Sequence, residues 1–131
     1  MPASNYVRTN TLAAWLQRQG FTVPSTLYVA LFTNNPTAAN SGTEVSGGGY
    51  TRAQATFGAP TISGDQAVIS NNAEVTFPKL TASAGTAAYV GIMDAASGGN
   101  LLFYQALATS LTLAYGYTPY FAAGELKIYL T

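Results

Sequence analysis

The chain has 131 residues, a length typical of one domain and sufficient to bury a core without a disulfide or a metal ion. Only 8% of the residues are charged, and five Lys and Arg residues balance five Asp and Glu residues; this argues against nucleic-acid binding, which needs a basic patch. The sequence contains neither histidine nor cysteine, which excludes imidazole-activated nucleophiles, disulfides and the usual zinc sites.

The first predicted element is a short amphipathic helix near the N-terminus. Leu12, Trp15 and Leu16 are spaced i, i+3, i+4 and therefore fall on one stripe. Gly20 is expected to end the helix. Candidate N-caps are Ser4, Asn10 and Thr11. So short a helix is marginal alone, so we expect its stripe to contact the domain or a neighbouring subunit.

A buried strand followed by a long loop is predicted next. Residues 27–33 (LYVALFT) have the length and composition of a strand, and both of its faces are apolar. This is typical of a central strand, or of one whose outer face is covered by the helix or a partner. Residues 34–49 are polar and rich in Gly and Asn, so they are predicted to form a loop. A loop of this length is unusual in a compact domain, which indicates a functional or partner-ordered segment.

The rest of the chain predicts short strands separated by turns. They are expected at residues 50–57, 67–70, 73–77, 88–94, 101–107, 111–113 and 125–130. The segment 97–100 (SGGN) is expected to form a hairpin turn. Leu126, Ile128 and Leu130 alternate with polar neighbours and are predicted to face inward. Their predicted core partners are Val75, Phe77, Val90 and Ile92.

These patterns together predict the fold class and the domain organisation. The fold class is mainly β, an antiparallel β-sandwich or jelly-roll-like domain with a short N-terminal helix. Residues 1–22 are assigned to an N-terminal helical docking segment, and residues 23–131 to the β-sandwich domain.

The carboxylates are the remaining candidates for acid–base chemistry. They are Glu44, Asp65, Glu74, Asp94 and Glu125. Because they fall in predicted loops, at a strand end or on outward strand positions, we interpret them as solvated or turn-capping groups. The glycine run 47–49 lacks the Lys-Ser/Thr and the helix of a P-loop, so it is interpreted as a turn. No catalytic residue, metal ligand or cofactor is therefore assigned.

Two further groups are candidate partner contacts. The first group is Glu44, in the predicted loop, and Arg52, on a polar strand face; Arg52 is either a contact to a partner or an ordinary sheet-face arginine. Tyr115, Tyr117 and Tyr120 lie in an aromatic segment. That segment favours a protein interface or local packing over a sugar-binding platform, because no acidic cluster or metal-ligand set accompanies the rings.

The chain resembles a family of small tailed-bacteriophage virion structural proteins, often labelled tail fibre protein or capsid decoration (cement) protein. The resemblance is carried by four strings in the family's order, LYVALFT at 27–33, GTEVSGGGYTR at 42–52, AYVGIMDAASGGNLLFYQAL at 88–107 and FAAGELKIYL at 121–130. It covers most of the chain. It implies a place in the virion, after assembly in the bacterial cytoplasm, but not which part of the virion.

The functional hypotheses combine this resemblance with the composition. A chain with so little charge is expected to have part of its surface covered by neighbours. The leading hypothesis is a non-enzymatic capsid decoration or cement protein that contacts the major capsid protein or other virion proteins, as a homo-oligomer within the particle. The alternative is a tail-tip or tail-fibre-associated adsorption module that binds a host-surface glycan, and a small carbohydrate-active enzyme ranks third. No membrane partner is expected, since no run approaches the ~18 apolar residues that span a bilayer.

Overall fold

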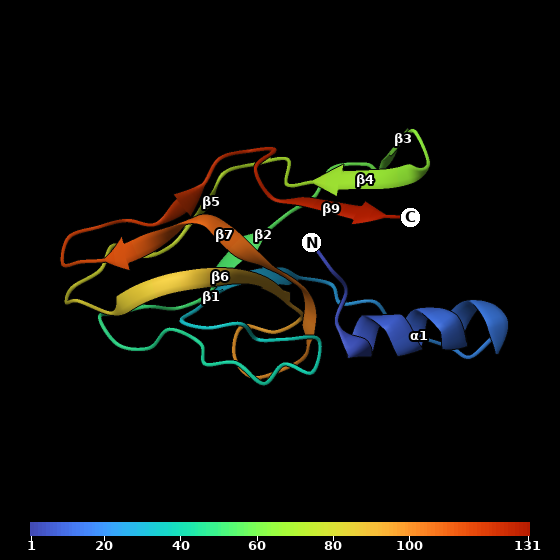
Figure 1. The fold of residues 1–131 in the computed structure, drawn as a ribbon, viewed down its shortest axis with the longest axis horizontal. Coiled ribbons are helices and arrows are strands. Elements are labelled where there is room, and N and C mark those ends of the chain that lie inside the picture. The colour runs from blue at the N-terminus through green and yellow to red at the C-terminus, as the bar shows by residue number, and fades with distance from the viewer.

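Residues 1–131, all of which the computed structural model describes, form three antiparallel sheets and one N-terminal helix (Figure 1). The elements are α1 (Asn5–Leu16), β1 (Leu27–Phe32), β2 (Ala53–Ala55), β3 (Thr61–Ser63), β4 (Gln66–Ser70), β5 (Val75–Thr76), β6 (Gly85–Met93), β7 (Leu101–Leu113), β8 (Tyr120–Phe121) and β9 (Lys127–Leu130). The prediction of a mainly β fold with a short N-terminal helix is confirmed. The jelly-roll arrangement stays a prediction.

The largest sheet has the strand order β2-β1-β6-β7. Strand β1 lies inside this sheet and pairs with both β2 and β6, as its two apolar faces predict. The predicted turn at 97–100 joins β6 to β7 as an antiparallel hairpin. The predicted strands 101–107 and 111–113 are parts of the single strand β7. The residues between them bulge, because both parts pair with β6 across a register shift.

The main core lies on one face of this sheet. Its sixteen buried residues come from β1, β2, β5, β6, β7, β8 and β9 and from the intervening loops. Leu126 and Ile128 belong to this core together with the four predicted partners, so this part of the prediction is confirmed. The inward assignment of Leu130 is wrong, because 65% of this residue is exposed. After Ile128, strand β9 leaves the core and pairs only with β4. The alternation of apolar residues continues to Leu130, but no other part of the chain covers that residue.

The second face of the large sheet carries a smaller apolar cluster. It contains Ala30, Phe32, Met93 and Leu101, with Tyr28, Tyr89 and Tyr104 packed against it. The predicted loop 34–49 contains no helix or strand and runs along the lower side of the sheet in Figure 1. Its ends are tied by backbone hydrogen bonds from Thr33 N to Thr43 O at 2.9 Å and from Val45 N to Leu31 O at 2.9 Å. The loop therefore has its own internal support.

The N-terminal helix begins at a predicted cap but ends earlier than expected. The side chain of Ser4 caps α1 by accepting a hydrogen bond from Val7 N at 3.2 Å. The predicted end at Gly20 is wrong: the helix ends at Leu16, and Arg18 adopts a φ of 58° that turns the chain out of the helix. A residue in the left-handed conformation just beyond the last turn ends a helix, so the later glycine at position 20 is not needed for this.

The residues before α1 belong to the β domain. Ser4 N donates to Leu102 O at 2.8 Å, and Tyr104 N donates to Pro2 O at 3.2 Å, so residues 2–4 extend the edge of β7. None of the α1 residues is buried. The division into segments 1–22 and 23–131 stays a prediction, but the structure fixes the root of the helix firmly to the large sheet.

Candidate functional site

The predicted apolar stripe on α1 is fully displayed on the surface. Leu12, Trp15 and Leu16 are 60%, 79% and 77% exposed, and α1 projects from one end of the molecule (Figure 1). The linker that follows adds exposed Phe21 and Val23, which sequence reasoning missed. We call α1 and the linker 17–23 the N-terminal arm. An apolar face of this kind on a monomer is typical of an interaction site.

The second projection at this end is the three-stranded sheet β3-β4-β9 (Figure 1). It carries a largely apolar hollow of about 170 Å³. The lining residues are Pro60, Ala67, Val68, Ile69, Phe103, Ile128 and Leu130. Ile62 on β3 is also exposed. Sequence reasoning missed this surface, because its residues come from four separate segments and Leu130 was predicted to face inward.

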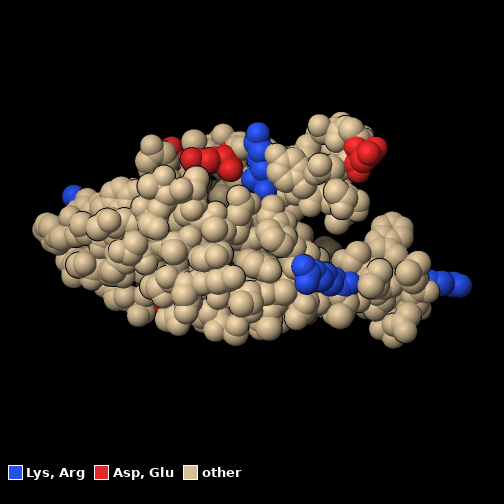
Figure 2. Space-filling model, viewed as in Figure 1, with Lys and Arg blue, Asp and Glu red and all other residues tan.

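Charge is sparse over this end of the molecule. Figure 2 shows a mostly uncharged face, with basic atoms on α1 and acidic atoms at the tip of the β3–β4 turn. The arm carries Arg8 and Arg18 and no acidic residue, whereas the β3–β4 hairpin carries Asp65 and no basic residue. The arm and the tip of the β3–β4 hairpin therefore carry opposite charges beside their apolar surfaces.

Glu44 and Arg52 form an ion pair inside the molecule. Arg52 Nη2 lies 2.8 Å from Glu44 Oε1, and Arg52 Nε donates to Glu44 Oε2 at 2.9 Å. Arg52 Nη1 donates to the carbonyl oxygens of Ala95 at 2.7 Å and Gly98 at 2.8 Å. Only 6% of the Arg52 side chain is exposed. Its guanidinium thus ties the 34–49 loop and β2 to the β6–β7 hairpin; contact with a partner stays a prediction for this pair.

Tyr50 completes this cluster. Its hydroxyl donates to Glu44 Oε2 at 2.8 Å and accepts from Leu31 N at 3.0 Å. Burial raises the pKa of Tyr50 well above its usual range, and the hydrogen bond to Glu44 adds to this effect. The hydrogen bonds that Arg52 donates to Glu44 raise the pKa of Arg52 as well. The cluster therefore holds a neutral phenol and a charged pair, a combination suited to fixing loops.

The remaining carboxylates and the glycine run serve local geometry. Asp94 Oδ1 accepts from Asn100 N at 2.7 Å, and Glu125 Oε2 accepts from Ala122 N at 2.7 Å; both bonds close turns. No group of three or more potential metal-ligating side chains gathers in the structure. In the glycine run, Gly48 has a φ of 61°, and a Cβ there would collide with the carbonyl oxygen of Ala82. The glycine run is therefore a turn that packs against residues 81–84.

The aromatic segment 115–121 lies far from the arm. Strand β7 ends opposite the arm, and the segment follows this end (Figure 1). Tyr115 is 79% exposed and Tyr120 is also exposed, whereas Tyr117 packs partly against the core. Hydrogen bonds from Leu80 N to Tyr117 O and from Gly116 N to Leu80 O, both 2.8 Å, hold the segment in place. The structure therefore does not bring the predicted tyrosines and the predicted helix stripe into one site.

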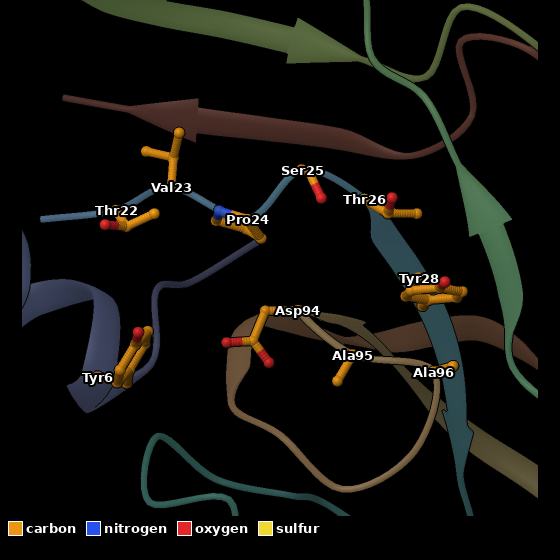
Figure 3. A pocket seen from close by; sticks show the side chains of 10 residues that line it. All are labelled: Tyr6, Thr22, Val23, Pro24, Ser25, Thr26, Tyr28, Asp94, Ala95 and Ala96. Atoms are coloured by element: carbon orange, nitrogen blue, oxygen red, sulfur yellow. The ribbon is translucent and has the colours of Figure 1, made fainter.

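A further hollow, of about 550 Å³, lies where the arm joins the β domain (Figure 3). Tyr6 and Tyr28 lie on opposite sides of it, so their rings do not form one stacking platform. Asp94 also lines it, but both carboxylate oxygens accept hydrogen bonds from Asn100. The one charged side chain that lines this hollow is therefore already engaged in hydrogen bonds within the protein.

The single helix, α1, is not long and apolar enough to cross a membrane. A family model described as Podophage GP4 fiber I protein gp80 matches residues 2–129. No curated protein matches the chain.

Proposed function

Because the chain belongs to the family described as Podophage GP4 fiber I protein gp80, a family of tailed-phage virion proteins, we propose that it is a structural subunit of the phage fibre. Membership confirms the resemblance that the four strings indicated. A role as a phage virion structural protein follows from it. The fibre is the finer part of this proposal, and the family's description as a fiber protein supports it.

We propose that the N-terminal arm is the element that docks this subunit onto its neighbours. The observation that carries this proposal is the exposure of Trp15 and Leu16 on a helix without a single buried residue. A 12-residue helix is marginal without packing, so contact with a neighbour would both cover its apolar face and stabilise its fold. Aromatic side chains are also the commonest energetic anchors of protein interfaces.

The far end of the molecule favours a second, compatible function. Tyr115 is exposed just beyond the end of β7 that lies opposite the arm, and this end is left free if the arm attaches the subunit. Exposed aromatic rings stack on sugar faces, so this end is a candidate for adsorption to a host-surface glycan. Binding of purified protein to host cells, with Tyr115→Ala as the test variant, examines this function.

Location and copy number in the particle test the fibre assignment. Gold-labelled antibody fragments against this protein are expected to decorate the tail or its fibres in electron micrographs. Quantitative mass spectrometry of purified particles is expected to give a few to a few dozen copies. Particles from a phage with the gene disrupted provide the control for labelling. Hundreds of copies with label over the head would instead identify a capsid decoration protein.

A further inference from the structure

We propose that the arm of one copy packs into the apolar hollow of the β3-β4-β9 sheet of a second copy, with Trp15 filling the hollow. This inference rests on the proposed function, because it names the partner of the same docking helix. The contact is heterologous: arm and hollow are different surfaces, so each copy carries one of each. Such contacts join copies into a closed ring where the rotation between copies closes, and into an open filament where it does not; two copies that exchange arms are the smallest closed form.

The hollow has the size and the chemistry to take an aromatic side chain. Its volume is about 170 Å³, and an apolar cavity of roughly 150 Å³ accommodates a benzene-sized ring. Six of the seven residues that line it are hydrophobic. Leu130 at this hollow and Ile62 on the neighbouring strand are exposed. An indole inserted here would cover apolar surface on both partners.

The arm of the same chain does not fill this hollow. Trp15 is 79% exposed and Leu130 is 65% exposed in the same molecule, so neither surface covers the other. The direction of α1 is set at its root, where Ser4 is buried, caps the helix and bonds to Leu102 O at 2.8 Å. Because this root is fixed, a hollow on another copy is the accessible one.

The charges on the two surfaces also match. Arg18 lies just beyond the end of α1, and Asp65 lies in the turn between β3 and β4; both are exposed. The first acidic residue of the chain is Glu44, so the arm has no acid that would repel Asp65 of another copy. Lys127 is at the opposite end of this sheet, paired with Ser70. With Trp15 in the hollow, a basic arm tip meets an acidic hairpin tip.

The first experiment measures the mass of the purified full-length protein against concentration by analytical ultracentrifugation. The wild type is expected to self-associate, and Trp15→Ala and Leu130→Asp are each expected to weaken association at least tenfold. Both positions are exposed, so these variants should keep the wild-type circular dichroism spectrum. Tyr115→Ala is the matched control, because Tyr115 is as exposed as Trp15, 79%, but lies at the other end. It should associate like the wild type.

The second experiment mixes the two weakened variants. The Leu130→Asp copy keeps an intact arm, and the Trp15→Ala copy keeps an intact hollow, so the mixture should form a complex containing both variants by native mass spectrometry. A wild type that stays monomeric, or a mixture that forms no such complex, would overturn the inference. If the wild type is monomeric while Trp15→Ala removes the protein from particles, the arm docks on another virion protein: the inference fails and the proposed function stands.

Discussion

At the scale of single residues, Arg52 is held by four hydrogen bonds from its guanidinium group. Its guanidinium makes a two-pronged contact with Glu44 and also bonds the carbonyl oxygens of Ala95 and Gly98. Lysine keeps the charge but cannot reproduce this planar set of donors. Arg52→Lys is therefore expected to lower the free energy of unfolding by about 1–3 kcal/mol in urea denaturation. A change below about 0.5 kcal/mol would show that the loops are held without it.

Tyr50 gives the protein a specific sensitivity to alkaline pH. Its pKa is raised in the folded protein, so above about pH 10 the unfolded chain loses this proton while the folded chain keeps it. The contribution of Tyr50 is thus complete below pH 10 and is lost as the pH rises further. Unfolding free energy should fall by up to about 1.4 kcal/mol per pH unit there because of this group. Tyr50→Phe should make the slope shallower, and an unchanged slope would contradict this assignment.

At the scale of elements, β9 marks the boundary between core and exposed surface. Leu126 is 2% exposed and packs in the core, whereas Leu130 is 65% exposed only four residues later. Leu126→Ala should therefore cost about 2–5 kcal/mol of unfolding free energy. Leu130→Ala, the same change in the same segment, should cost less than about 0.5 kcal/mol. Equal effects in thermal or urea unfolding would mean that the two positions share one environment.

The sequence patterns predicted β1, β6 and the hairpin at 97–100 because each combines an apolar run with a turn signal. They overestimated the strand at 50–57, of which only β2 forms. Beyond β2, Leu31 N bonds the Tyr50 hydroxyl and Leu31 O bonds Val45 N, so β1 has no backbone groups left to extend that pairing. They missed β3, a short polar segment with one apolar residue, which is a strand only because β4 pairs with it.

The candidate site was predicted in part for similar reasons. The stripe on α1 follows from helical spacing alone, so Leu12, Trp15 and Leu16 were found without the structure. The apolar hollow of the β3-β4-β9 sheet forms only where β4 pairs with β9 and Phe103 lies beside them. No local sequence pattern predicts these long-range contacts. The internal bonds of Arg52 depend equally on the position of the β6–β7 hairpin.

At the scale of the whole molecule, the proposed docking arm and the exposed Tyr115 loop lie at opposite ends. The arm and the β3-β4-β9 sheet project together from one end, and the exposed Tyr115 loop lies at the other (Figure 1). The large sheet and its core connect the two ends and hold them in fixed relation. This polarity suits the proposed role as a fibre subunit, which attaches at one end and presents the other.

Incorporation of arm variants into phage particles tests this account most directly. A variant with Leu12→Ser, Trp15→Ser and Leu16→Ser removes the apolar stripe, and a Tyr115→Ser variant removes an equally exposed aromatic residue at the other end. The number of copies per purified particle, measured by quantitative mass spectrometry, should fall about tenfold or more for the arm variant, since loss of a buried aromatic anchor costs 1.4 kcal/mol or more. It should stay at the wild-type level for Tyr115→Ser. Wild-type incorporation of the folded arm variant would contradict the arm as the docking element.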